Sequence, residues 1–280
     1  MYRMRAFAVT VICCILVFAL GTGAVRGVTV KVDRLSFPSL YVQLLYSDSV
    51  VAQATGFVVA HKQKHFLITN WHVLSGRRVD TNEPLFWRDT VAFFPHEVCI
   101  FHHGKTPGTW VRRYERLRDA KNHPRWLEHP RGREIDVAAL PLESVDDEVR
   151  LYPLDLSLAN TDMKVYLGMP VSIIGFPFGL TGPRLLPIWK TGHIASDPYV
   201  DWKRQPVVLI DATTRGGMSG SPVVVRFFWG YHDTSGFFIM DGAVHTLFFG
   251  VYSGRIYPDS ELGKVWRPRV ITEILEQAGH

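Results

Sequence analysis

The feature that most constrains this fold is a series of short apolar runs, rich in Val, Ile, Phe and Tyr, separated by Gly, Pro, Asn and Asp. Runs of this length and composition between turn-forming residues predict β-strands. No helical pattern lies between them, which argues against a parallel α/β sheet and favours an all-β sandwich or barrels. The predicted strands are 28–32, 40–45, 55–59, 65–69, 90–94, 98–101, 136–140, 171–175, 207–212, 221–225 and 247–252.

One α-helix is predicted, over residues 265–278 near the C-terminal end. Pro268 suits its first turn, and Gly279 follows its end. We expect the helix to pack its apolar face against the body of the protein. The residues at helical spacing on that face are Val265, Val270, Ile271, Ile274 and Leu275.

The N-terminal segment 1–24 is typical of a secretory signal. Arg3 and Arg5 precede an uncharged run over residues 6–20, and small residues follow it. A run of 15 residues is shorter than the roughly 20 that a membrane-spanning helix needs. We therefore expect cleavage after Ala24, with an uncleaved membrane anchor as the alternative. Either way the remaining chain, 25–280, is expected to be exported, as a periplasmic or secreted protein.

Charge and cysteine content narrow the function further. The net charge of +5 over 280 residues is too small to predict nucleic-acid binding. Cys13 and Cys14 fall in the signal segment, so Cys99 has no partner for an internal disulfide and packing alone must hold the fold. The segment 103–135 carries nine Lys/Arg against four Asp/Glu. We expect a solvated surface loop there, pinned by its tryptophans, with binding to an anionic surface as the alternative.

The segment 215–222, Arg-Gly-Gly-Met-Ser-Gly-Ser-Pro, has features that a nucleophilic serine needs. Gly220 leaves the approach to Ser219 uncrowded, and Gly217 can adopt the tight turn that points its N–H toward a developing oxyanion. An ordinary glycine–serine turn before a strand is the alternative interpretation.

Two further segments offer partners for such a serine. The polar pair Thr69-Asn70 ends an apolar run, so a strand end would deliver His72 as a general base. Asp136 opens an apolar strand, where a buried carboxylate needs a partner such as an imidazole. Each residue alone could be structural. Together they give the order His, Asp, Ser along the chain, which suits a cleft between two barrels.

The blocks Thr-Asn-Trp-His-Val, Asp-Val-Ala-Ala-Leu and Gly-Met-Ser-Gly-Ser-Pro resemble the three signature blocks of trypsin-like serine peptidases. The resemblance is closest to the bacterial HtrA (DegP-like) branch and spans roughly residues 40–256. It implies a chymotrypsin-like fold of two antiparallel six-stranded β-barrels, about 28–145 and 160–258, with the active site between them.

The resemblance also implies the roles of the site residues. Ser219 would be the nucleophile, His72 the general acid/base and Asp136 the residue that orients it, while the N–H groups of Gly217 and Ser219 would form the oxyanion hole. The implied activity is that of an exported serine endopeptidase that works through an acyl-enzyme. A catalytically inactive relative that binds peptides or the cell envelope is the alternative, and Ser221 is the next serine to consider as nucleophile.

The sequence departs from the family pattern at several positions. Met218 stands where digestive members carry the aspartate that pairs with a new N-terminus, so activation by zymogen cleavage is not expected. Ser221 replaces the glycine that is common after Ser-Gly. Only 61 residues follow Ser219, so no PDZ module is expected after the protease domain.

Expectations about the substrate follow from the same resemblance. Thr213 resembles the floor of the primary specificity pocket, and its lack of charge favours small or aliphatic side chains. The segment 252–254 resembles the pocket wall that pairs with substrate backbone, through Tyr252, Ser253 and Gly254. The expected partner is a protein or peptide substrate, without nucleic acid, and with membrane contact only if the N-terminal segment stays uncleaved; the oligomeric state is left open.

No cofactor and no metal are expected. Zinc-type ligands do occur close together, at His96, Cys99, His102 and His103. Strand alternation would place His96 and His102 on the opposite face from Cys99 and His103, which argues against one metal site.

Overall fold

The computed structural model describes residues 32–277. The predicted signal segment 1–24 lies outside the described residues, as does the predicted strand 28–32 except for Val32. No helix of the described part is long and apolar enough to cross a membrane.

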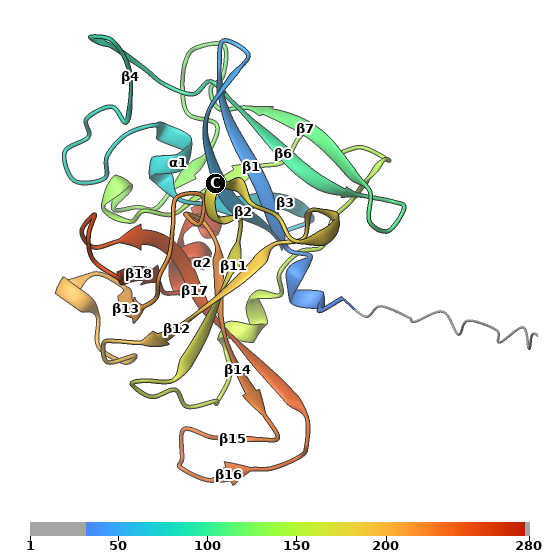
Figure 1. Ribbon diagram of the computed structural model, residues 1–280, viewed down its shortest axis with the longest axis vertical. Helices are drawn as coiled ribbons and strands as arrows, with labels where there is room; N and C mark the ends of the chain where they lie inside the picture. The colour runs from blue at the N-terminus through green and yellow to red at the C-terminus, as the bar shows by residue number, and fades with distance from the viewer. Residues whose placement is uncertain (1–31, 278–280) are drawn as a thin grey trace, which may run out of the picture. The chain divides into compact units, whose positions relative to one another are not determined.

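The first half of the described chain forms one antiparallel sheet of eight strands (Figure 1). Seven of them follow the order β10-β6-β1-β2-β3-β9-β8, and the eighth, β7, pairs with β6. A separate hairpin, formed by β4 (Phe86–Arg88) and β5 (Val91–Phe93), lies between β3 and β6 in the sequence. The strands of the large sheet are β1 (Ser39–Tyr46), β2 (Ser49–His61), β3 (Lys64–Thr69), β6 (Glu97–Gly104), β7 (Trp110–Arg116), β8 (Leu127–Glu128), β9 (Ala138–Pro141) and β10 (Val149–Arg150).

The second half closes into a six-stranded barrel in the order β11-β12-β13-β18-β17-β14. The strands are β11 (Pro170–Gly175), β12 (Ile188–Ile194), β13 (Val207–Asp211), β14 (Pro222–Phe228), β17 (Val244–Arg255) and β18 (Leu262–Trp266). Between β14 and β17 the chain forms an arm that carries the small strands β15 (Tyr231–His232) and β16 (Phe238–Ile239). The all-β class and the second six-stranded barrel are therefore confirmed.

The first sheet departs from the expected six-stranded barrel because the basic segment 103–135 contributes strands. Residues 110–116 form β7, which pairs with β6, and residues 127–128 form β8 at the opposite edge. Glu115 on β7 is buried, and its carboxylate accepts the N–H groups of Glu143 and Ser144, each at 2.7 Å. The expectation of a surface loop is therefore wrong for residues 103–104, 110–116 and 127–128, which lie in strands, whereas Trp126 is buried as expected.

The C-terminal helix α2 (Arg269–Glu276) is shorter than predicted. Val265 lies in β18, where it pairs with Val208 of β13 and Tyr252 of β17 and so closes the barrel. The strand ends before Pro268, which precedes the first helical residue. The four remaining apolar residues of the predicted face are all buried, at Val270, Ile271, Ile274 and Leu275.

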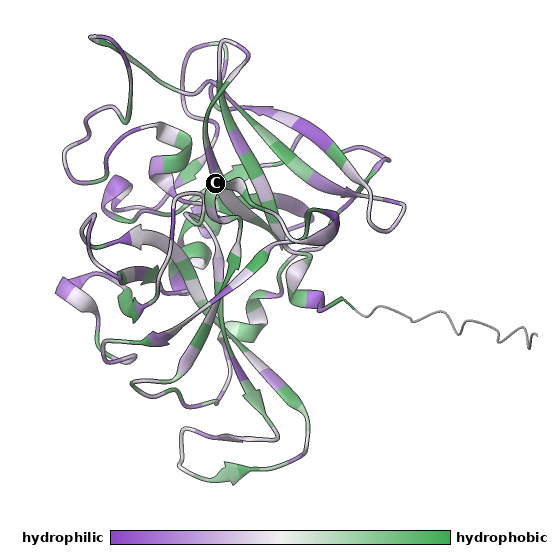
Figure 2. Cartoon of the chain, viewed as in Figure 1, coloured by the Kyte–Doolittle hydropathy of each residue, from purple (hydrophilic) through white to green (hydrophobic). Residues whose placement is uncertain are grey.

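One apolar core joins the two sheets. It includes Phe57 and Phe66 from the first sheet, Val224 and Phe248 from the barrel, and the buried face of α2 with Ile274. Figure 2 shows hydrophobic residues along the strands of both sheets, with hydrophilic ones frequent in the loops between them. This shared core holds the two sheets together.

Candidate active site

His72 is held by the turn between β3 and a short helix, α1 (Trp71–Ser75). Asn70 precedes the helix, is buried, and donates its side-chain amide to the backbone C=O of Asp136 at 2.7 Å. Gly76 ends the helix in the left-handed conformation, at φ 66°, and donates its N–H to the His72 C=O at 3.1 Å. Both ends of the helix are thus fixed, and with them the backbone of His72.

Asp136 is 1% exposed and makes two hydrogen bonds with His72. Its Oδ1 accepts the backbone N–H of His72 at 2.9 Å, and its Oδ2 lies 2.8 Å from the ring Nδ1. A neutral imidazole that donates from Nδ1 leaves Nε2 as a proton acceptor. The pair therefore fixes the ring orientation and the tautomer that a general base needs.

Ser219 lies in the loop between β13 and β14 and is half-buried. Its C=O accepts the N–H of Thr55 at 2.9 Å, and the next N–H, of Gly220, donates to the Tyr252 C=O at 2.9 Å. A Cβ on Gly220 would lie 3.1 Å from the Cα of Thr69. The loop therefore packs directly against the end of β3, three residues before His72.

The Ser219 hydroxyl makes no hydrogen bond to the described residues. Within residues 32–277, no hydrogen bond joins the Ser219 hydroxyl to the His72 ring. Such catalytic hydrogen bonds are often long in unliganded enzymes and shorten in the substrate complex. Ser221, by contrast, is 0% exposed, so of these two serines only Ser219 is open to a substrate.

Two backbone N–H groups beside Ser219 are available to bind an oxyanion. Gly217 has a φ of 92°, and its C=O accepts the Thr55 hydroxyl at 2.8 Å. The C=O of Gly216 accepts the N–H of Phe178 at 2.6 Å. These bonds fix the peptides on both sides of Gly217. Among the described residues, neither the Gly217 N–H nor the Ser219 N–H donates to a protein acceptor.

Met218 has a structural environment that the family comparison did not suggest. Its side chain is 0% exposed and packs in the core of the barrel with Tyr252, Val223 and Val265. Apolar packing therefore anchors the loop at the position before Ser219.

The residues expected to form the substrate pocket differ in how exposed they are. Thr213 is exposed, whereas its neighbour Thr214 is buried and bonds to the Tyr252 hydroxyl. The Tyr252 side chain is buried, and its N–H and C=O are both bonded, to Ser221 and Gly220. This differs from the expectation, because neither its side chain nor its backbone groups are free to contact substrate.

Ser253 and Gly254 lie where the pairing of β17 with β18 shifts register, between Tyr252 and Arg255. The Ser253 hydroxyl accepts the indole N–H of Trp266 at 3.0 Å. Ser253 also lines the cleft that contains His72 and Asp136. Of the predicted pocket wall, Ser253 therefore borders the candidate site.

The cleft beside His72 has a volume of about 1090 Å³ and is lined by α1 and loops of the first half of the chain and by strands and loops of the second. Sequence reasoning missed most of its lining, because the residues come from five separate segments of the chain. Its charged residues besides Asp136 are Arg78, Asp80, Arg131, Arg133, Glu134, Arg255 and Lys264.

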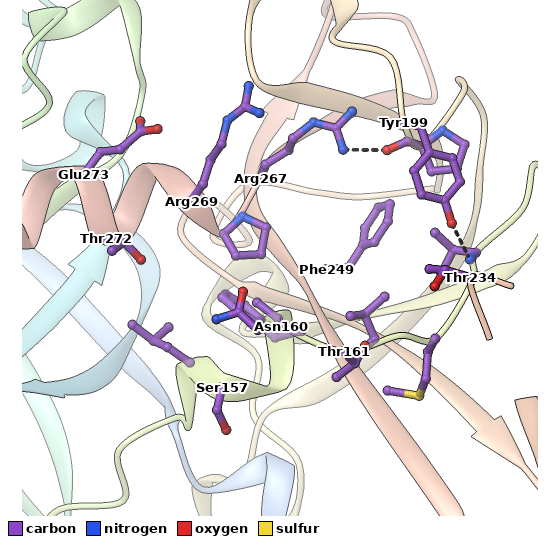
Figure 3. Close-up of a pocket in the computed structure, with 18 residues that line it drawn as sticks. Ser157, Asn160, Thr161, Tyr199, Thr234, Phe249, Arg267, Arg269, Thr272 and Glu273 are labelled. Carbon is purple, nitrogen blue, oxygen red and sulfur yellow. Dashed lines mark hydrogen bonds between the residues drawn. The ribbon is translucent and has the colours of Figure 1, made fainter.

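A second cavity, of about 790 Å³, lies between α2, the barrel and the segment that joins the two halves (Figure 3). Its two arginines are already paired. Arg267 bonds to Asp201 at 2.8 Å and to the Pro198 C=O at 2.5 Å, and Arg269 bonds to Asp201 at 2.5 Å. This cavity does not include the candidate triad.

The possible zinc ligands do not converge. Residues 32–277 contain no group of three or more His, Cys, Asp or Glu side chains placed to hold a metal ion. His96 accepts the Ser47 N–H at 3.0 Å, and the His103 ring lies 3.0 Å from the Phe37 C=O.

Comparison with known proteins identifies the family. A family model described as a trypsin-like peptidase domain matches residues 54–226, which is more than half of the chain. A comparison with curated proteins found no match.

Several solved serine proteases are similar to this chain at low identity. A thermostable serine protease, AL20, from an extremophilic microorganism is 13% identical over 88% of this chain and 98% of its own, with a TM-score of 0.49. A serine endoprotease from Yersinia pestis is 14% identical over 89% and 67%, with a TM-score of 0.48. The Rv3671c protease from M. tuberculosis, in its active form, is 17% identical over 88% and 82%, with a TM-score of 0.46. The domain match carries the assignment: the chain belongs to the trypsin-like peptidase family and is a serine-type endopeptidase.

Proposed function

We propose that this protein is an exported serine endopeptidase that cleaves peptide bonds through an acyl-enzyme on Ser219. The observation that carries the proposal is the doubly bonded Asp136–His72 pair beside a loop whose Gly217 and Ser219 N–H groups have no protein acceptor in the described chain. One half of this arrangement provides a base and the other stabilises an oxyanion, which are the two requirements of acyl transfer.

The proposed reaction has two halves. His72 Nε2 takes the proton of the Ser219 hydroxyl as its oxygen attacks the scissile carbonyl, and the N–H groups of Gly217 and Ser219 bind the resulting oxyanion. Collapse breaks the C–N bond, and His72 gives its proton to the leaving amine. Water then attacks the ester with His72 again as base, which releases the acid and restores Ser219. Asp136 stays ionised and stabilises the imidazolium in both halves.

Export is proposed from the segment 1–24, whose basic start, apolar run and small residues match a signal peptide. N-terminal sequencing of protein recovered outside the cytoplasm tests this directly. A mature N-terminus at Val25 supports cleavage, whereas a chain that keeps Met1 and partitions with membranes supports the anchor.

Hydrolysis of a denatured protein substrate tests the catalytic roles. We expect Ser219→Ala and His72→Ala each to lower kcat by roughly 10⁴-fold or more, because the triad acts as a unit. Ser221→Ala is the matched control, since this buried serine lies only two positions away and should keep most activity. Normal turnover by Ser219→Ala would overturn the assignment.

A further inference from the structure

The cleft beside the catalytic histidine has more basic than acidic lining residues. Five of its lining residues are Arg or Lys, and besides the buried Asp136 only Asp80 and Glu134 are acidic. Its volume of about 1090 Å³ is far larger than one side chain requires, and it includes Ser253 at the edge of the serine loop. The positive charge therefore lines the space beside the reacting groups.

Two of the five cations are already engaged by the protein. Arg131 pairs with Glu134 at 3.1 Å, and the Nε of Arg133 donates to the Val79 C=O at 3.2 Å. Glu134 thus neutralises one arginine of the cleft and leaves the others.

The remaining three cations are not engaged by any side chain in the part of the chain that the structure describes. Within residues 32–277, the side chains of Arg78, Arg255 and Lys264 make no ion pair and no hydrogen bond. Arg78 and Arg255 are exposed, and Lys264 is half-buried.

These three side chains approach the cleft from both halves of the molecule. Arg78 follows α1 in the first half, whereas Arg255 ends β17 and Lys264 lies in β18 of the barrel. Like charges on facing walls raise the local potential of a cleft, because low-dielectric walls focus the field. A ligand that carries negative charge would relieve this repulsion, and for a peptidase that ligand is a peptide substrate.

We propose that this cleft selects substrates with Asp or Glu within a few residues of the scissile bond, and that Arg78, Arg255 and Lys264 determine this specificity. The inference rests on the proposed function, since it assigns the substrate class of the same site. It also explains why Arg78, Arg255 and Lys264 have no acidic partner among the described residues, although they line the same cleft as His72.

The test compares matched peptides. Cleavage sites are first mapped by mass spectrometry on a mixed peptide library, and the best site is then made as two quenched fluorescent peptides that differ only in Glu or Gln beside the scissile bond. We expect kcat/KM to favour the Glu peptide by roughly tenfold at low salt, the sum of several exposed charge pairs. The preference should shrink as NaCl screens the cleft, while the Gln peptide should respond little.

Variants separate the cleft from general electrostatics. Arg78→Gln, Arg255→Gln and Lys264→Gln combined should bring the Glu-to-Gln ratio close to one. Lys105→Gln is the matched control, because this exposed lysine lies in the β6–β7 turn and does not line the cleft. It should leave the ratio unchanged.

Labelling of Ser219 by a small neutral fluorophosphonate distinguishes the two ways of failing. Equal cleavage of both peptides by a wild-type chain that labels normally would overturn the acidic preference and leave the peptidase assignment standing. Absence of both cleavage and labelling would overturn the proposed function and this inference with it. The salt titration uses the wild-type chain, so it decides the question even if the combined variant does not fold.

Discussion

At the scale of single residues, Thr55 connects the two halves of the candidate site. Its N–H donates to the Ser219 C=O at 2.9 Å, and its hydroxyl donates to the Gly217 C=O at 2.8 Å. The same hydroxyl accepts the N–H of Phe176 at 3.1 Å. The Thr55 C=O in turn accepts the hydroxyl of Thr69 at 2.8 Å, on the strand that leads to the histidine. One buried threonine of the first sheet thus positions the serine loop of the barrel.

Thr55→Val should therefore impair catalysis more than substrate binding. The change keeps the shape of the side chain but leaves the Gly217 C=O and the Phe176 N–H without their shared partner, so the oxyanion loop loses a fixed orientation. We expect kcat to fall roughly 10- to 100-fold with KM nearly unchanged. Thr55→Ser restores the hydroxyl and should recover most of the loss. Equal kcat values for the Val and Ser variants would contradict a positioning role.

His102 is a second residue whose environment makes a measurable prediction. It is 0% exposed, and burial, together with the nearby charges of His103 and Arg113, lowers its pKa from 6.5 to about 4. Within the described chain, neither ring nitrogen has a hydrogen-bond partner. Between pH 6.5 and about 4 the unfolded state binds a proton at His102 that the folded state does not bind. His102 therefore does not reduce the free energy of unfolding above pH 6.5, and it reduces it progressively as the pH falls toward 4.

The substitution His102→Leu should remove the part of this pH-dependent loss of stability that comes from His102. The free energy of unfolding of the wild type should decrease between pH 7 and pH 5, by up to about 1.4 kcal/mol per pH unit for each such histidine. His103, whose pKa burial also lowers to about 4, should keep part of the slope in the variant. Urea denaturation at several pH values measures both slopes. Identical slopes in the two proteins would show that His102 is protonated in the folded state.

At the scale of elements, the arm between β14 and β17 differs from the barrel that carries it. Its tip exposes large apolar side chains, and β16 is coloured as hydrophobic in Figure 2. The exposed residues include Phe228, Trp229, Phe237, Phe238 and Met240. The strands that flank the arm, β14 and β17, also form part of the barrel, where Val224 on β14 and Phe248 on β17 are buried in the shared core. Stability should therefore depend on the base of the arm and hardly on its tip.

A matched pair of substitutions tests this contrast. Phe237 is 73% exposed and Phe248 is 1% exposed. We expect Phe248→Ala to lower the free energy of unfolding by about 3–5 kcal/mol through lost burial and a cavity, and Phe237→Ala to change it by about 0.5 kcal/mol or less. Equal losses for both, measured by urea denaturation, would mean that the tip packs against part of the protein.

The elements also show what a single sequence can and cannot predict. Strands such as 40–45 and 171–175 were recognisable because their apolar runs are bounded by turn residues, and they match β1 and β11. Strand β7 was not recognisable, because Arg112 and Arg116 are exposed and Glu115 is buried against backbone N–H groups from elsewhere in the chain. Val265 was assigned to the helix because its spacing fits one, whereas barrel closure requires it in β18.

At the scale of the whole molecule, the site depends on the joining of two sheets. His72 and Asp136 come from the first half and Ser219 from the second, and the core shared by Phe57, Phe248 and α2 holds these halves together. Sequence reasoning predicted the three residues because each sits in a local motif. It could not predict the basic cleft, whose cations are spread over four segments and meet only in the folded chain.

The central claim is that Ser219 is an activated nucleophile, and covalent labelling tests it most directly. The purified chain is treated with a fluorophosphonate, and the modified residue is located by mass spectrometry. The account predicts labelling of the wild type at Ser219, none in Ser219→Ala, and labelling slowed by at least about 100-fold in His72→Ala, because the base is gone. Labelling at another residue, or equal labelling of wild type and Ser219→Ala, would contradict it.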